Sequence, residues 1–371
     1  MIHQLEHGYV RVRPLYHALA FNLEIDAILD GNTRGQVYVD DPAAPRRALI
    51  WDQMNTLFLA GQADNADFNA ALNHLLTTQL IPDAAERHLD DFILYTDHEA
   101  WERELDVVLQ GFAPFEARRR LYKLGRLQVD WRAQLPPGTR MARVDRDLLA
   151  DERLENRIQV VNWITSFWPG TEDFLARGLG FCLIEGQTIA SWCLAVFASG
   201  NRFEFGTETV AACRRRGFST LVTAAGVDHC LAHNVTPAWH CWDNNAASIG
   251  VAEKVGFQQV KTYTVRRFGF TPFDHLILQA EHFYNYYDFG RAAALVEAAF
   301  QVQAPPNKFY HYFAARLWAR AGSPERAFRY LDQAIDAGWD DAGRLQADPD
   351  LSSLYPSDAW AALLARLAPA S

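Results

Sequence analysis

Between residues 180 and 268 the sequence alternates segments typical of β-strands with segments typical of helices. Two apolar runs, 181–185 and 188–197, flank Gly186-Gln187, a dipeptide suited to a two-residue hairpin turn. The segments that follow alternate in type: strand 202–210, helix 220–233, strand 238–242, helix 245–255 and strand 259–265. This order predicts an α/β (α+β) fold, because alternating strands and helices bury their apolar faces in shared layers.

The turn between the strand that ends at Val210 and the helix that begins near Thr220 is basic and contains one glycine. Its sequence is Arg214-Arg215-Arg216-Gly217-Phe218-Ser219. The first N–H groups of a helix have no intrahelical partner, and together with the helix dipole they attract an anion. Gly217 lets the backbone approach a ligand closely, and the arginines can add charge-assisted hydrogen bonds. The turn is therefore predicted to bind a pyrophosphate; the alternative is that the basic triplet is solvated surface.

Two motifs in this region resemble those of the GCN5-related N-acetyltransferase (GNAT) superfamily. Arg214-x-x-Gly217-x-Ser219 is similar to its acyl-CoA loop, usually written (Q/R)xxGx(G/A), and 245–257 is similar to its Asn-initiated helix ending in Lys-x-Gly-Phe. The resemblance implies the GNAT acyl-CoA N-acyltransferase fold, with acetyl-CoA (coenzyme A) as co-substrate and no metal. It implies transfer of an acetyl group to a primary amine of a small molecule by direct attack on the thioester.

Within the superfamily, the sequence most resembles the branch that includes the zwittermicin A resistance acetyltransferase. The residues that carry this finer resemblance are Glu204, Thr209, Arg214, Gly217, Pro237, Trp239, Asn245 and Ser248. The branch favours an aminopolyol antibiotic or a related metabolite as the acceptor. It also has an extra N-terminal α/β segment, which residues 1–135 would supply.

The resemblance assigns a set of residues to the coenzyme: Thr209, Val210, Arg214, Arg215, Arg216, Gly217, Phe218, Ser219, Thr220, Asn245 and Ser248. For Asn245, capping of its own helix is an equally good interpretation. Ser219 stands where the family has Gly or Ala, but it is small and its hydroxyl could bond a phosphate oxygen. Ala252 stands where many relatives have a Tyr that protonates the leaving thiolate, so a Tyr general acid at that position is excluded.

Glu204 is the first candidate for the general base, because its place matches a carboxylate with that role in several relatives. Partial desolvation there would raise its pKa. It could instead point outward or bind a cationic substrate. His240, on the following strand, is the second candidate, with a core or surface histidine as the alternative. Four aromatic residues precede the sheet and are either an acceptor wall or core: Trp163, Phe167, Trp168 and Phe174.

Two proline-containing boundaries, Pro136-Pro137-Gly138 and Thr271-Pro272, divide the chain into three predicted domains. The resemblance makes 1–135 a degenerate GNAT-like α/β half and 138–270 the catalytic domain; 274–371 is all helical. In the first domain we expect helices at 14–30, 66–80, 98–110 and 114–124, and strands at 36–40 and 48–51.

The helical domain contains an internal repeat of 35 positions (327 minus 292). The first set is Ile277, Ala280, Phe283, Ala292, Val296 and Ala299; the second is Tyr312, Ala315, Trp318, Ala327, Leu331 and Ala334. This period resembles tetratricopeptide (TPR) repeats. Such helices would suit a protein or carrier-protein partner. The alternative function is therefore a catalytically weak pseudo-acetyltransferase that acts as a CoA-binding or partner-binding scaffold, which Ala252 also favours.

The net charge of −10 argues against a nucleic-acid partner and suits a cationic amine. No apolar run reaches the ~20 residues of a membrane span, and the polar start gives no sign of a secretory signal. All five cysteines lie between 182 and 241 without metal spacing, so reduced buried thiols are the better interpretation. We therefore expect a cytoplasmic protein without a membrane partner.

Overall fold

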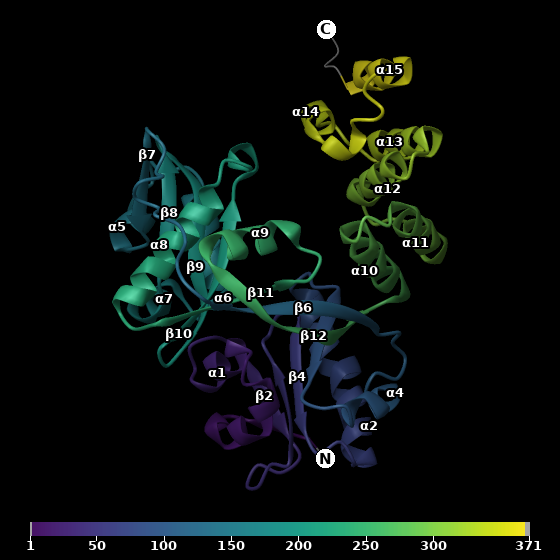
Figure 1. The fold of residues 1–371 in the computed structure, drawn as a ribbon. Coiled ribbons are helices and arrows are strands. Elements are labelled where there is room, and N and C mark those ends of the chain that lie inside the picture. Colours follow the sequence, from purple (N-terminus) through teal and green to yellow (C-terminus); the bar gives the residue numbers. More distant parts are fainter. Residues whose placement is uncertain (1, 368–371) are drawn as a thin grey trace. The chain divides into compact units, whose positions relative to one another are not determined.

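The computed structural model describes residues 2–367, which form two compact units (Figure 1). The first, here the sheet unit, contains the residues up to Leu89 together with Ile93–Gly111 and Phe115–Arg267. The second, here the helical unit, contains Asp90–Phe92, Phe112–Pro114 and the chain from Phe268 onward. Each unit has its own apolar core, so each is described by itself.

One mixed sheet runs through the sheet unit, in the order β1-β2-β3-β4-β5-β12-β6-β11-β10-β9-β8-β7. Its strands are β1 (His3–Leu5), β2 (Gln36–Val39), β3 (Arg47–Trp51), β4 (Thr56–Gly61), β5 (Asp91–Thr96), β6 (Phe115–Leu124), β7 (Thr139–Arg143), β8 (Gly180–Glu185), β9 (Thr188–Ser199), β10 (Arg202–Thr209), β11 (Thr236–Trp242) and β12 (Phe257–Gly269). This arrangement of strands and helices confirms the predicted α/β (α+β) class.

The predicted helix at 114–124 is wrong, because this segment is the strand β6. It pairs antiparallel with β11 on one side and β12 on the other, so that Tyr122 lies opposite both Trp239 and Gln259. Ala117 and Leu121 have helical spacing and are buried, which explains the error. The segment is extended because β11 and β12 pair with it on both sides. Such tertiary hydrogen bonding readily overrides local helical propensity.

Two other N-terminal predictions need correction. The helix expected at 14–30 is divided into a 3-10 helix η1 (Tyr9–Leu19) and an α-helix α1 (Leu23–Leu29), where the side chain of Asn22 accepts a hydrogen bond from the N–H of Glu24. The helix expected at 98–110 is reduced to the 3-10 turn η3 (Trp101–Arg103) and the short α4 (Leu105–Val108). The helix expected at 66–80 is present as α2 (Ala66–Leu75), continued by a π-helical turn η2 (Leu76–Leu80) and α3 (Ile81–Glu86).

Helices cover both faces of the second half of the sheet. α8 (Phe218–Ala232) and α9 (Ala246–Val255) share one core with the strands, which contains the fully buried Val222, Ala252 and Cys193. A second core holds α5 (Arg146–Ala150), α6 (Arg157–Phe167) and α7 (Thr171–Arg177), with Trp168 and Phe174 at its centre. All five cysteines are buried and unpaired, as expected.

The helical unit confirms the prediction of an all-helical 274–371 as far as residue 367, and residues 368–371 lie outside the described residues. Its helices are α10 (Pro272–Asn285), α11 (Phe289–Val302), α12 (Lys308–Arg320), α13 (Pro324–Asp336), α14 (Ala342–Ala347), the 3-10 turn η5 (Pro349–Leu351) and α15 (Asp358–Leu367). α10 packs against α11 and α12 against α13. The small residues of the repeat, Ala280 with Ala292 and Ala315 with Ala327, are fully buried, so these helices approach closely. Their likeness to TPR repeats stays a prediction.

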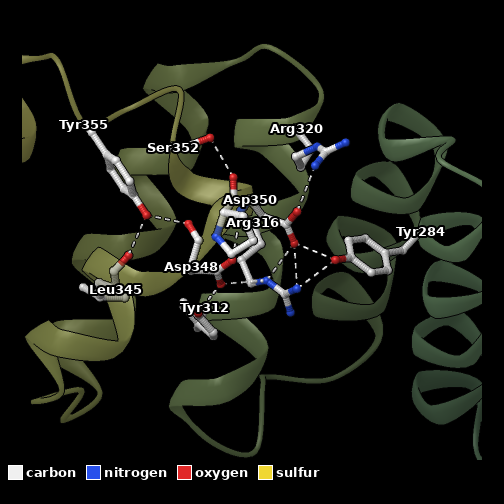
Figure 2. Close-up of polar contacts among 10 residues, drawn as sticks. Tyr284, Tyr312, Arg316, Arg320, Leu345, Asp348, Asp350, Ser352 and Tyr355 are labelled. Carbon is white, nitrogen blue, oxygen red and sulfur yellow. Dashed lines mark hydrogen bonds and ion pairs between the residues drawn. The ribbon is translucent and has the colours of Figure 1, made fainter. Parts of the chain in front are cut away.

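A polar cluster lies inside the helical unit, around Asp348 and Asp350 (Figure 2). One oxygen of Asp350 accepts hydrogen bonds from the Tyr284 hydroxyl at 2.6 Å and from Arg316 at 2.6 Å, and the other accepts one from Arg320 at 3.1 Å. Arg316 also lies 3.0 Å from Asp348, which accepts from the Tyr312 hydroxyl as well. The cluster therefore joins α10, α12 and η5 by charge-assisted bonds.

Candidate active site

The strands β10 and β11 separate after only three residues of parallel pairing. The paired positions are Arg202 with Thr236, Phe203 with Pro237, and Glu204 with Ala238. β10 then continues to Thr209 and β11 to Trp242. The register of β10 against β9 shifts between Glu204 and Phe205, as in a β-bulge. Because the described strands form no ladder beyond this point, their backbone N–H and C=O groups face a gap in the sheet.

A cavity of about 580 Å³, here the turn cavity, extends from this gap to the basic turn. Its lining includes the second half of β10, Gly206 to Thr209, and the first turns of α9. Of the residues assigned from sequence to the coenzyme, those that line it are Thr209, Arg214, Arg215, Ser219, Asn245 and Ser248. The motifs therefore meet in one place although they lie about 30 residues apart (245 minus 214).

The basic turn has a backbone suited to close approach. Arg215 and Gly217 both have left-handed backbone angles, with φ of 64° and 80°, and Gly217 is the N-cap of the 15-residue helix α8. Because the first N–H groups of α8 have no intrahelical partner, they remain available to an anion. Ser219 is positioned by a chain of hydroxyls, since its Oγ lies 3.1 Å from Thr209 Oγ1, which lies 2.8 Å from Ser191 Oγ.

The three arginines of the turn have different surroundings. Arg214 donates from Nε to the Thr209 carbonyl at 3.1 Å and from Nη2 to Glu208 at 3.3 Å. Arg216 forms a bidentate pair with Glu185 at 2.6 and 2.8 Å. Its guanidinium also lies over the Phe218 ring, which is buried in the core. Among the assigned residues, Val210, Arg216, Gly217, Phe218 and Thr220 do not line the turn cavity.

The start of α9 combines a structural role with a place in the cavity. Asn245 Oδ1 accepts from the N–H of Ser248 at 3.0 Å, so the capping interpretation is confirmed. Ser248 Oγ accepts from Trp239 Nε1 at 3.1 Å. At the other end, Gly256 has φ of 113°, and a Cβ there would lie 1.8 Å from the carbonyl oxygen of Arg126. The glycine of the Lys-x-Gly-Phe motif is therefore required by the fold.

A second cavity of about 440 Å³, here the acidic cavity, lies at the same gap and shares four lining residues with the turn cavity. The shared residues are Trp163, Phe205, Gly206 and His240. Three carboxyl groups line it, from Glu24, Asp52 and Glu204. Trp163 and Phe167 also line it, whereas Trp168 and Phe174 are core, where Trp168 Nε1 donates to the Ala195 carbonyl at 2.8 Å.

Glu204 and His240 form a buried pair at the junction of the two cavities. Nδ1 of His240 lies 3.0 Å from Oε2 of Glu204, and their side chains are 2 % and 8 % exposed. Nε2 of His240 is buried and has no hydrogen-bond partner among residues 2–367. Burial alone would raise the pKa of Glu204, but His240, Arg119 and Arg202 outweigh it and hold that pKa below its usual value. The expectation of a raised pKa is therefore wrong.

The N-terminal half contributes charged groups that the sequence interpretation missed. Burial, and then the neighbouring Asp52, raise the pKa of Glu24 well above its usual value. Burial raises the pKa of Asp52 to about 6, against hydrogen bonds from the N–H groups of Thr56 and Met54. The guanidinium of Arg119 stays charged despite burial, because Tyr95, Tyr263, Glu204 and Glu24 raise its pKa. One feature of the sequence could have indicated Glu24 as a site residue, namely its position inside an apolar run, Leu23-Glu24-Ile25.

Two general properties of the described residues bear on the class of site. Residues 2–367 contain no group of three His, Cys, Asp or Glu side chains placed to hold a metal ion. Within the same range, no helix is both long and apolar enough to cross a membrane.

Comparisons with known proteins agree with this geometry. The family model described as GNAT acetyltransferase matches residues 13–266. The chain is similar to the uncharacterized N-acetyltransferase YdfB of Bacillus subtilis (strain 168), with 26 % identity over 239 residues that cover 64 % of this chain and 87 % of that protein. It is also similar to the crystal structure of a GCN5-related N-acetyltransferase-like protein from Streptococcus suis 89/1591, with a TM-score of 0.52 and 22 % identity, covering 70 % of this chain and 98 % of that one.

Proposed function

This chain belongs to the GNAT acetyltransferase family, whose members use acetyl-CoA, and we propose that it acetylates a primary amine of a small molecule. The amine would attack the thioester directly. The observation that carries the proposal is the meeting of two cavities at the gap between β10 and β11, with His240 lining both. A donor in the turn cavity and an acceptor in the acidic cavity would then meet at one buried base.

The turn cavity fits the coenzyme. Acetyl-CoA supplies an acetyl thioester when it is bound. The unpaired N–H groups at the start of α8 would hold its diphosphate, with Arg214 and Arg215 adding positive charge. Arg216 would contribute only its backbone, because its side chain is paired with Glu185. Thr209, Ser219, Asn245 and Ser248 would line the path between the turn and the gap.

His240 would be the general base and Glu204 its positioning residue, which reverses the order expected from sequence. When Nδ1–H donates to the Glu204 carboxylate, Nε2 keeps its lone pair, on a side chain that lines both cavities. The new bond forms between the amine nitrogen and the acetyl carbon as the carbon–sulfur bond breaks, and the sulfur leaves with its electron pair as the thiolate of coenzyme A. The proton of the amine passes to Nε2, and the resulting imidazolium is stabilised by the carboxylate behind it.

The proposal also includes the chemical class of the acceptor amine. Amide and hydroxyl groups of Asn22, Thr33 and Thr56 line the acidic cavity beside its carboxyl groups. Such a lining favours an amine that carries hydroxyl groups. This agrees with an aminopolyol antibiotic or related metabolite, and with the resemblance to the zwittermicin A resistance branch.

The second candidate is a catalytically weak scaffold that binds CoA and presents a protein or carrier-protein partner to its TPR-like helices. Ala252, in place of a Tyr general acid, is the observation that favours it. A ligand at ~100 times its dissociation constant adds ~2.7 kcal/mol to the stability of the form that binds it. Protection of this chain by acetyl-CoA without thiol release from any amine would support the scaffold.

The decisive experiment measures thiol release from acetyl-CoA by His240→Gln, with His74→Gln, an exposed histidine on α2, as the matched control. Removal of a general base lowers kcat by about 100-fold to 10,000-fold. We expect a loss in this range for His240→Gln, unchanged thermal protection by acetyl-CoA, and wild-type turnover in the control. Turnover within threefold of the wild type in His240→Gln would show that another group takes the proton.

A further inference from the structure

The walls of the acidic cavity differ in chemistry according to their origin. The side that follows β6 in sequence supplies mainly aromatic and apolar side chains, among them Trp163, Phe167 and Phe197. The side that precedes β6 supplies carboxyl, amide and hydroxyl groups, among them Glu24 and Asp52. The recognition of polar groups is therefore assigned to the N-terminal half, which carries no part of the coenzyme motifs.

Glu24 and Asp52 place two carboxyl groups side by side in this wall. Glu24 is buried on α1, and Asp52 follows β3. Oδ1 of Asp52 is fixed by the N–H groups of Met54 at 2.7 Å and Thr56 at 2.9 Å. Adjacent carboxyl groups in a buried site cannot both ionise without a cation between them, and here Asp52 raises the pKa of Glu24. A ligand cation would oppose that shift.

The reacting amine has its own place in the same cavity. Nε2 of His240, on a side chain that is 2 % exposed, is without a partner among the residues described, whereas Nδ1 of the same ring lies 3.0 Å from Glu204. Glu204 and Glu24 are close enough for each to influence the charge of the other. The cavity therefore has two acidic positions, one at the gap and one at α1, within about 440 Å³. This volume is in the range of small-molecule sites.

We propose that the acceptor is a compact diamine: one amino group reacts at His240, while Glu24 and Asp52 bind the second as an ammonium ion. This inference rests on the proposed function, because it deepens the same site. The second ammonium fixes the orientation of the acceptor, so that the neutral end is directed at the gap. Arg119 does not neutralise this pair: it lowers the pKa of Glu24, but burial and Asp52 outweigh it and keep that pKa well above its usual value.

The test compares kcat/KM for acetylation of 1,4-diaminobutane, 1-aminobutane and 4-amino-1-butanol. A charge-assisted hydrogen bond contributes enough for about a tenfold preference. We expect the diamine to be preferred at least about tenfold over both others. In Asp52→Asn and Glu24→Gln, that ratio should fall toward one. The control Asp106→Asn removes an equal charge from the exposed start of α4 and should keep the wild-type ratio.

The outcomes separate this inference from the proposed function. If the three amines are acetylated with equal kcat/KM, or if 4-amino-1-butanol has the same kcat/KM as the diamine, the proposal of a second-ammonium site is wrong. The proposed acetyl transfer is then unaffected. If no amine is acetylated, but 1,4-diaminobutane raises the melting temperature of the wild type and not that of Asp52→Asn, the site stands and the enzymatic proposal fails. If the diamine neither reacts preferentially nor protects the wild type, the inference is overturned.

Discussion

The two units each contain a cluster of buried charged residues, and the clusters differ in how completely their polar atoms are bonded. In the helical unit, both oxygens of Asp350 accept bonds, from Tyr284, Arg316 and Arg320 (Figure 2). In the sheet unit, Glu24 and Asp52 face each other beside a cavity, and Nε2 of His240 has no partner among the described residues. In the first cluster both carboxylate oxygens are bonded, whereas in the second a buried ring nitrogen is not.

This difference indicates what each cluster is for. A satisfied buried network fixes the packing of the elements around it, because every lost bond leaves a charge without a partner. An unsatisfied one reduces stability, and such a cost is typical of sites where a substrate supplies the missing partner. The polar cluster around Asp350 is therefore structural, whereas the acidic cavity has the unsatisfied polar atom that the proposed binding and proton transfer need.

The largest effect on stability should come from Asp350→Ala. Its removal leaves two arginines and a tyrosine hydroxyl without their acceptor, which costs about 3 kcal/mol in the free energy of unfolding. Hydrogen exchange followed by mass spectrometry should show faster exchange in α12 and η5, with unchanged kcat/KM for acetyl transfer. The control Asp340→Ala removes an 89 % exposed carboxylate paired with Lys308 and should cost less than about 0.5 kcal/mol. Lower activity with unchanged exchange would mean that the Asp350 cluster is functional.

Asp52→Asn should increase the free energy of unfolding, whereas Asp350→Ala should decrease it. The pKa of Asp52 is raised by burial to about 6 in the folded state, from a usual value of 3.8. Its contribution to stability is thus fully present below the usual pKa and is lost as the pH rises through about 6. Asn keeps the Oδ1 acceptor and carries no charge, so we expect the variant to be about 2 kcal/mol more stable than the wild type at pH 8, and equal to it near pH 4.

Urea denaturation at the two pH values measures this difference, with Asp106→Asn as the exposed control. The control should show no comparable gain at pH 8. If Asp52→Asn is instead less stable than the wild type at pH 8, the carboxyl pair stabilises the fold, and the contrast between the two clusters disappears.

Tyr284→Phe should have the smallest effect. It removes a hydroxyl that donates to Asp350 at 2.6 Å and accepts from Arg316 at 2.9 Å, which costs about 1 kcal/mol in the stability of the helical unit. Tyr287→Phe, at a side chain that is 68 % exposed, serves as the control and should change nothing. A neutral result at Tyr284 in urea denaturation would show that the Asp350 cluster does not depend on each of its bonds.

The parts of the site that follow from local geometry could be predicted from the sequence. The basic turn, the capping Asn245 and the glycine after α9 each depend on a few neighbouring residues, so their motifs indicate their conformation. The repeat of the helical unit was also visible, because packed helices need small residues at fixed spacing. Glu204 and His240 were identified as candidates, but their contact and the direction of the pKa shift of Glu204 were not.

The rest depends on residues that are distant in sequence. β6 has the spacing of a helix and becomes a strand because β11 and β12 offer it hydrogen bonds on both sides. Glu24 and Asp52 belong to a half of the chain without any catalytic motif, and only the fold brings them to the cavity beside Glu204. Arg119 lies on that mispredicted strand, so its place in the site was lost with the strand.

Neighbouring residues were enough to predict the strand, turn and helix of the proposed coenzyme site, because backbone angles and capping hydrogen bonds are decided within a few residues. Only the packing of distant segments sets which carboxyl groups share a cavity and whether their pKa values are raised or lowered. The reason is physical: a pKa depends on the water that is excluded and on the charges that lie nearby, and both are set by segments far apart in the chain.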